Sequence, residues 1–181
     1  MCIDLETLSM RSNAVITAIA AVVWEEGSDP GDLVAKFEVF VDPNQPGRHI
    51  CPDTVMWWFQ QDSMAIKASY GEDLHRIPLD EALIGLEMFR KRWQDQSENP
   101  MLIWTNDPSF DAAILKDATN GNSPPWYYRN TRCCRTAFDH VTTEELEDLK
   151  IQLGTVKHAP LDDAHLSAAT VQIYHRKSGL A

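Results

Sequence analysis

The stretch Ile3-Asp4-Leu5-Glu6-Thr7 places two carboxylates two positions apart within an apolar context. Alternate side chains of a β-strand point to the same face, so Asp4 and Glu6 would project together from one strand. Neighbouring carboxylates repel each other, and burying them is unfavourable unless a cation or a donor compensates. Because a long, mostly apolar run follows at residues 13–24, the pair favours a metal site beside a core strand over a solvated strand.

The first part of the sequence predicts an antiparallel meander of three strands. Residues 1–8 and 13–24 are the first two expected strands, with a short polar turn between them. A cluster of Gly, Asp and Pro at residues 25–31 marks the next turn. The third expected strand is 33–41, with the sequence LVAKFEVFV.

Helices and one further strand are expected after the meander. A helix is indicated by proline and aspartate at its first turn and by apolar residues at helical spacing. A short apolar run after a proline is typical of a buried strand. The expected elements are a helix over 52–61, a helix over 79–93, a strand over 101–104, a helix around 112–115 and a final helix to about residue 176.

Trp57, Trp58 and Phe59 are consecutive aromatic residues in the first of these helices. Three neighbours cover too much of a helix circumference to share one buried face. We expect at least one of them to pack in the core. A remaining ring could stack on a base of a nucleic acid or form a subunit contact, and the second alternative is compatible with a homodimer.

Length and composition predict one domain over residues 1–181, with 44% hydrophobic residues available for a core. The formal net charge of −11 argues against broad electrostatic binding to nucleic acid. It does not exclude a metal-dependent nuclease, because carboxylates that bind cations are neutralised in the working protein. No apolar run approaches the roughly twenty residues that cross a bilayer, and no signal peptide is expected.

The four cysteines are Cys2, Cys51, Cys133 and Cys134. Their spacing fits no zinc pattern, and an adjacent pair is awkward for an ordinary disulfide framework. We therefore expect a reduced protein in the cytoplasm.

A further carboxylate follows the expected strand over 101–104. Asp107 or Ser109 could cap the next helix, and Asp111 would lie in its first turns. Asp111 could simply interact favourably with the helix dipole. The functional alternative is a third carboxylate delivered from a strand end towards Asp4 and Glu6.

The last acidic cluster, Asp162-Asp163, follows His158 at the start of the final helix. These residues could be an ordinary loop histidine and two helix-start acids. An imidazole has a pKa of about 6.5, and His158 lies five residues before Asp163. That arrangement would let the acid hold a metal while the imidazole reaches a water molecule beside it. The pattern alone does not separate Asp162 from Asp163.

Four acids and one histidine in this chain order resemble the DEDD superfamily of 3′-to-5′ exonucleases, specifically its His-containing branch. Two further stretches resemble the short phage and bacterial members of that branch. The resemblance runs from about residue 2 to residue 175. The stretches that carry it are 4–8 (DLETL), 109–111 (SFD), 158–163 (HAPLDD), 57–61 (WWFQQ) and 128–136 (YRNTRCCRT).

The resemblance implies an α/β, RNase H-like fold: a mixed central sheet, an N-terminal three-strand meander and helices on both faces. It also implies hydrolysis with two Mg²⁺ or Mn²⁺ ions about 4 Å apart. Hard cations prefer oxygen ligands, so such a site uses carboxylates rather than cysteines. The implied ligands are Asp4, Glu6, Asp111 and Asp163, and His158 is the implied general base.

The implied substrate is the 3′ end of single-stranded DNA or RNA, from which nucleoside 5′-monophosphates are released in a bacterial or phage-infected cell. Alternatives are an exoribonuclease restricted to short or structured RNA, and a catalytically silent nucleic-acid-binding module. The complete set of acids favours an enzyme. Asp107 departs from the small residue common in relatives and would add a carboxylate near the metal site. The expected substrate-binding residues are Thr7, Leu8, Trp57, Phe110, Arg129 and Arg132.

Overall fold

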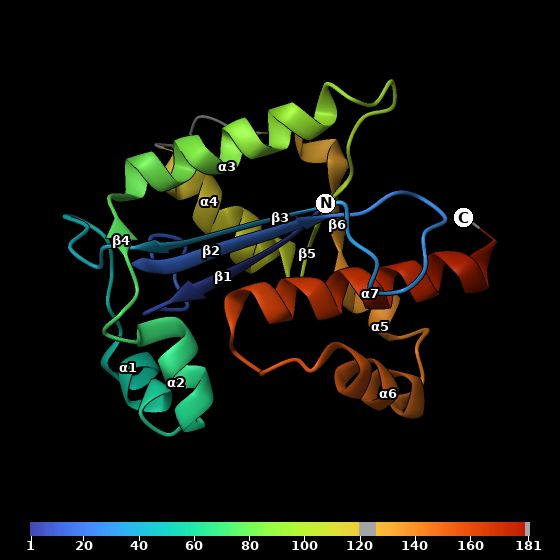
Figure 1. The fold of residues 1–181 in the computed structure, drawn as a ribbon. Coiled ribbons are helices and arrows are strands. Elements are labelled where there is room, and N and C mark those ends of the chain that lie inside the picture. Colours follow the sequence, from blue (N-terminus) through green and yellow to red (C-terminus); the bar gives the residue numbers. More distant parts are fainter. Residues whose placement is uncertain (120–125, 180–181) are drawn as a thin grey trace.

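The computed structural model describes residues 1–119 and 126–179. Within them, six strands form one mixed sheet with the order β4-β3-β2-β1-β5-β6 (Figure 1). The strands are β1 (Cys2–Thr7), β2 (Ile16–Val23), β3 (Ala35–Val41), β4 (Arg76–Ile77), β5 (Ile103–Thr105) and β6 (Thr131–Cys133).

Strands β1, β2 and β3 pair antiparallel in sequence order, which confirms the predicted meander. On the other side of β1, β5 pairs parallel to β1 and β6 pairs parallel to β5. The carboxyl ends of β1, β5 and β6 therefore point to the same end of the sheet. Segments that leave these three strands are brought together there.

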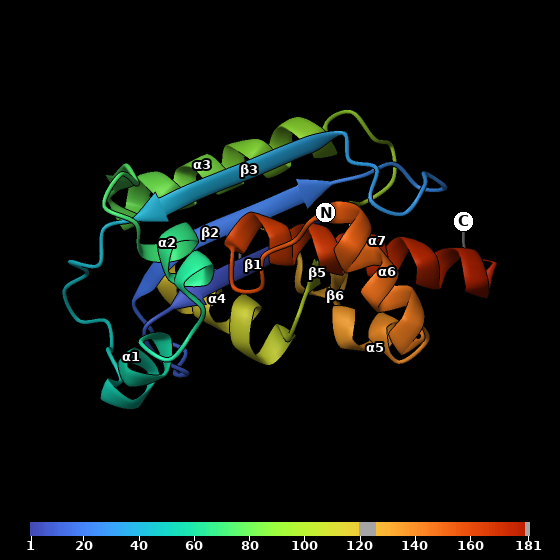
Figure 2. The ribbon, with the colours of Figure 1, turned by 60° about the horizontal axis from the view of Figure 1, so that its bottom comes forward.

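Helices cover both faces of the sheet, as expected. In Figure 1, α3 and α4 lie above the sheet, and α5, α6 and α7 lie below it. The turned view in Figure 2 shows α7 running along the sheet beside β1 and β2, with α1 and α2 near its start. The helices are α1 (Pro52–Trp58), α2 (Ser63–Tyr70), α3 (Leu79–Gln94), α4 (Ala113–Ala118), α5 (Cys134–Phe138), α6 (Thr143–Leu153) and α7 (Pro160–Ser178).

Residues of β1 alternate between two cores. Ile3 and Leu5 pack on the α3 side, in a cluster that also contains Leu86, Ile114 and Leu115. Cys2 faces the other side and packs with a small-residue cluster from β2 and α7: Ala20, Val22, Ala164, Ala168 and Val171. By the same alternation, Asp4 and Glu6 face α7.

Several element bounds differ from the sequence-based expectation. The helix predicted over 52–61 ends at Trp58, and a separate helix, α2, begins where the Asp62 side chain accepts a hydrogen bond from the Met64 N–H. The strand predicted over 101–104 is Ile103–Thr105. Helix α3 matches its predicted range closely. Strands β4 and β6 and helices α5 and α6 were not predicted.

In the described part of the chain, no helix combines the length and the apolar character needed to span a bilayer.

Candidate active site

Strand β1 supplies the first two acids of the site. Asp4 is opposite Ala20 and Glu6 is opposite Ala18 in the antiparallel pair. These small partners leave the space above both carboxylates unfilled by cross-strand side chains. Glu6 is 6% exposed, so its carboxylate lies in a largely desolvated position.

The third acid, Asp111, lies in the turn that follows the neighbouring strand β5. Ile3 pairs with Thr105 in the parallel ladder, so the chain leaving β5 passes the carboxyl end of β1. It enters a π-helical turn, Pro108–Ala112, whose N-cap Asp107 accepts a hydrogen bond from the Ser109 N–H at 2.8 Å. This confirms Asp107 as a cap. Asp111 lies inside the turn, 2% exposed, and accepts the Asp107 N–H at 3.2 Å.

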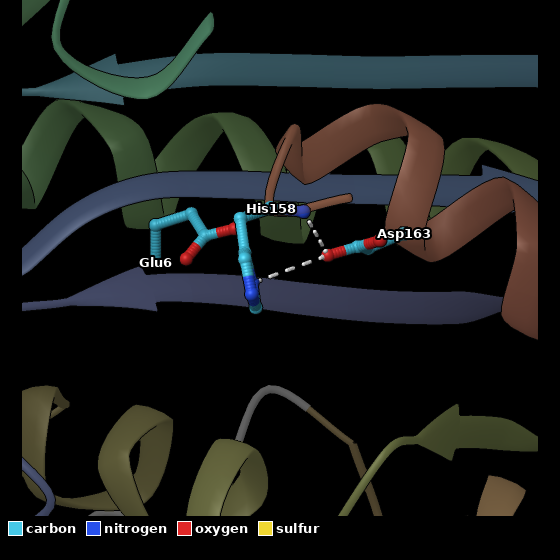
Figure 3. Close-up of side chains that lie close together, drawn as sticks. All are labelled: Glu6, His158 and Asp163. Atoms are coloured by element: carbon cyan, nitrogen blue, oxygen red, sulfur yellow. Dashed lines mark hydrogen bonds and ion pairs between the residues drawn. The ribbon is translucent and has the colours of Figure 1, made fainter. Parts of the chain in front are cut away.

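The start of α7 brings the last acid and the histidine together. Pro160 occupies the first turn, where its missing N–H costs nothing. The His158 N–H donates to Asp163 Oδ2 at 2.9 Å, and His158 Nδ1 is 3.9 Å from the same oxygen. Figure 3 shows both contacts, with the side chain of Glu6 beside them. Ligand atoms of Glu6, His158 and Asp163 all lie within 4.8 Å of one another.

Asp162 has a different role from its neighbour. Its Oδ2 accepts the Val156 N–H at 2.9 Å and holds the loop before α7. It does not line the cleft that contains Asp163. The structure thus separates two acids that the sequence pattern left equivalent.

A cleft of about 770 Å³ joins these groups. It is lined by all five predicted catalytic residues and by three of the six predicted substrate-binding residues, Thr7, Trp57 and Phe110. Leu8 does not line the cleft, and neither do Arg129 and Arg132. The predicted catalytic residues in its lining are Asp4, Glu6, Asp111, His158 and Asp163.

The four acids carry raised pKa values. Burial, followed by repulsion from the other acids, holds the pKa of Asp4 and of Glu6 well above their usual ranges. Burial raises the pKa of Asp111 to about 7 and the pKa of Asp163 to about 6. Without a compensating charge, these acids therefore release their protons at a higher pH than ordinary carboxyl groups do.

The donor set fits a divalent cation. No lysine or arginine forms an ion pair with any of the four acids within residues 1–119 and 126–179. His158 Nε2 is buried and lacks a hydrogen-bond partner among the same residues. Burial, with Lys157 nearby, also lowers the pKa of His158, which keeps its imidazole neutral and able to accept a proton. Oxygen ligands gathered without a counter-charge are the ligands that hard cations prefer.

Two tryptophans form one wall of the cleft. Trp58 is buried, and its Nε1–H donates to the Thr7 carbonyl at 3.1 Å, so α1 is tied to the end of β1. This confirms the prediction that at least one consecutive aromatic packs in the core. Trp57 is 42% exposed and meets the His158 ring edge-on at a centroid distance of 4.9 Å. Phe59 is 72% exposed and lies outside the cleft lining.

Basic side chains also line the cleft. Arg135 is the second residue of α5, which begins directly after β6, and its Nη1 is 3.4 Å from Asp107 Oδ2. Lys150 and Lys157 also line the cleft. The sequence contained one usable signal for Arg135, because it follows Arg129 and Arg132 at a regular spacing of three residues, but this spacing did not show which arginine faces the site.

Comparisons with known proteins bear on the family and the fold. A family model described as the 3′-5′ exoribonuclease Rv2179c-like domain matches residues 1–175. Among solved structures, the nuclease domain of 3'hExo, a DEDDh family member bound to rAMP, superposes with a TM-score of 0.61 at 13% identity. The match covers 98% of this chain and 91% of that chain and confirms the RNase H-like fold. No curated protein matches the chain.

Proposed function

Because it matches that family model over residues 1–175, the chain belongs to the Rv2179c-like 3′-5′ exoribonuclease domain family, and we propose that it shortens single-stranded RNA or DNA from the 3′ end. As a 3′-to-5′ exonuclease, it acts on nucleic acid. The observation that carries the finer proposal is the convergence of four acids and His158 in one cleft at the carboxyl ends of β1 and β5.

The four acids are the proposed metal ligands. Asp4, Glu6, Asp111 and Asp163 would hold two Mg²⁺ or Mn²⁺ ions between β1, the turn after β5 and the start of α7. Ions bound there would supply charge stabilisation at the scissile phosphate and at the leaving 3′-oxygen. The raised pKa values of these acids support the assignment, because a cation would compensate both the burial of the charged carboxylates and their mutual repulsion.

His158 is the proposed general base. Its imidazole lies beside Glu6 and Asp163, its Nε2 has no partner among the described residues, and its pKa is lowered by burial. A neutral ring in this position can take the proton from the attacking water. The balanced reaction adds water across the terminal phosphodiester and releases a nucleoside 5′-monophosphate and a shortened strand with a 3′-hydroxyl.

The cleft walls are the proposed nucleotide-binding surfaces. Trp57 and Phe110 line the cleft, and a terminal base could stack on either ring. Thr7, the last residue of β1, also lines the cleft. Arg135, with a side chain that is 67% exposed, lines the cleft together with Lys150 and Lys157 and is the proposed contact for a phosphate. Leu8 and the exposed arginines Arg129 and Arg132 would act on the strand only outside this cleft.

RNA is the favoured substrate class, since the matching family is described as exoribonuclease. A preference for short or structured RNA is the second candidate, and a comparison of single-stranded with hairpin-forming RNA distinguishes it. Three exposed apolar side chains support the expected homodimer contact: Met56 on α1, Phe59 directly after α1, and Met64 on α2. Analytical ultracentrifugation of the wild type and a Phe59→Glu variant would test that contact.

The deciding experiment uses 5′-labelled RNA and DNA of the same sequence, single-stranded and hairpin-forming. Each is incubated with the protein in Mg²⁺, in Mn²⁺ or in EDTA. We expect a ladder that shortens from the 3′ end with metal and disappears in EDTA, with RNA degraded faster than DNA. Equal binding with no cleavage under any condition would contradict the proposal and favour a silent binding module.

A further inference from the structure

The backbone of His158 adopts an uncommon conformation. Its φ is 64°, and within the described residues it is the one non-glycine residue with a positive φ. L-residues adopt this left-handed region infrequently, and such a conformation persists only when surrounding contacts over-determine it. The contacts that hold this peptide therefore decide where the imidazole points.

Side chains from two other segments hold both backbone polar groups of His158. Its N–H donates to Asp163 Oδ2 at 2.9 Å, and its carbonyl accepts from Ser69 Oγ at 2.7 Å. Asp163 is itself a proposed metal ligand. Ser69 lies on α2, 89 positions away in sequence, and does not line the cleft. Of these two hydrogen bonds, the one from Ser69 can be removed without changing the acid cluster.

Ser69 is presented from a firmly anchored helix end. Its side chain is fully buried, and its own carbonyl accepts from Arg76 Nη2 at 3.0 Å. The Arg76 guanidinium also lies over the Tyr70 ring, 5.9 Å from its centroid. The Tyr70 hydroxyl is 3.1 Å from Thr17 Oγ1 on β2. The end of α2 is therefore tied to the central sheet, which makes the Ser69 hydroxyl a rigid reference point.

We infer that Ser69 is a positioning residue for His158, whose hydroxyl holds the loop carbonyl so that the imidazole stays beside Glu6 and Asp163. This rests on the proposed function, in which His158 is the general base. Ser69 touches no reacting atom and acts only through the peptide of His158. Without the hydroxyl, the peptide is held on one side only and can relax towards a negative φ, which turns the ring away from the acids.

The neighbouring indoles do not replace this contact. Trp57 and Trp58 meet the His158 ring edge-on, with centroid distances of 4.9 and 5.8 Å. They limit the space around the ring but do not fix the His158 peptide. The indole N–H of Trp58 is already bonded to the Thr7 carbonyl. The two backbone polar groups of His158 are therefore held by Ser69 and Asp163.

Ser69→Ala tests the inference, because alanine keeps the helix and removes only the hydroxyl. Its matched control is Thr170→Val, which removes another fully buried hydroxyl, one that donates to the Leu166 carbonyl at 2.8 Å within α7. We expect Ser69→Ala to lower kcat about 3- to 10-fold with an unchanged KM for the 3′ end. Thr170→Val should retain the wild-type kcat, and both variants should lose a similar amount of thermal stability.

A second readout needs neither metal nor substrate. The ring signals of His158 in ¹H–¹³C NMR spectra can be assigned from their loss in His158→Ala. We expect them to shift or broaden in Ser69→Ala and to remain in place in Thr170→Val. An unchanged ring signal or an unchanged kcat in Ser69→Ala overturns the inference, as does an equal loss of kcat in both variants. If the wild type cleaves no strand, the proposed function fails, and the ring signal alone decides the positioning.

Discussion

The carboxylate of Asp163 accepts the backbone N–H of His158 at 2.9 Å and lies 3.9 Å from its ring Nδ1. One acid thus contacts both the peptide and the imidazole of the proposed base while its ligand atoms also face Glu6. A substitution of Asp163 would disturb the metal ligands and the base together. Tests that separate the two functions therefore have to use other residues of the site.

Asp111→Asn tests the metal site with the least change of shape. The amide oxygen can still accept the Asp107 N–H, so the turn should be retained. We expect cleavage of labelled RNA and DNA to fall about a hundredfold or more, because a neutral amide is a weaker ligand for a hard cation. Circular dichroism should show an unchanged fold. Strong residual cleavage would refute the ligand role of Asp111.

The acid cluster predicts an inverted pH dependence for the stability of the metal-free protein. Folding raises the pKa of Asp111 from 3.8 to about 7 and that of Asp163 from 3.8 to about 6. The folded state then binds more protons than the unfolded state in this window, so the cluster's contribution to stability falls as pH rises from about 4 to about 7. Melting curves should show this fall, at about 2–4 °C per kcal/mol lost.

Saturating Mn²⁺ or the Asp111→Asn substitution should reduce this fall, because the cation offsets the charge of the buried carboxylates and the substitution removes one of them. Asp53→Asn, at the rim of the same cleft, is the control and should leave the slope unchanged. A slope that is equal in all four samples would contradict the raised pKa values as its cause.

His158→Ala should lower the cleavage rate by about 10²- to 10⁴-fold and retain metal binding measured by calorimetry. A base works in its neutral form, so the wild-type rate should rise with pH through the pKa of His158 and then level off. Burial lowers that pKa below 6.5, which places the rise on the acidic side. A wild-type profile with the same acidic limb as the variant would exclude the general-base role.

Trp57 and Phe59 form a matched pair for the stacking prediction. Both are exposed aromatics of one helix end, but only Trp57 lines the cleft. Trp57→Ala should raise KM for a single-stranded 3′ end by about tenfold, in line with the stacking free energy of one base. Phe59→Ala should leave KM unchanged. Equal effects of the two substitutions would show that the cleft position of Trp57 is not what matters.

The arginines can be distinguished by the salt dependence of binding. Arg135 lines the cleft, whereas Arg129 and Arg132 do not. For a single-stranded oligonucleotide in Ca²⁺, Arg135→Ala should weaken binding and reduce the salt slope by about 0.7, the value for one phosphate contact. Arg129→Ala and Arg132→Ala report contacts outside the cleft. If neither changes affinity at any salt concentration, the hypothesis that one of them binds phosphate is wrong.

Local pattern was sufficient for the elements whose side chains repeat with a clear period. The meander and α3 were predicted with bounds close to those observed, because alternation and helical spacing are visible within a few residues. Strands β4 and β6 have only two and three residues. Their extended conformation depends on pairing with β3 and β5, which no local pattern encodes.

Helix α6 was missed although the sequence carried a signal for it. Thr142 and Glu145 form a capping box, and Gly154 ends the helix in the left-handed conformation. A search for cap residues rather than for hydrophobic periodicity alone would have located this element.

The sequence by itself determined which acids and which histidine were available, and that Asp4 and Glu6 share one face, since strand alternation is a property of the backbone. Tertiary structure decided between Asp162 and Asp163, because consecutive helical residues point in different directions and only the packing of α7 on β1 selects one. It also decided that Ser69 reaches His158, a contact across 89 positions. Such contacts depend on how distant segments pack, and no spacing within one segment records them.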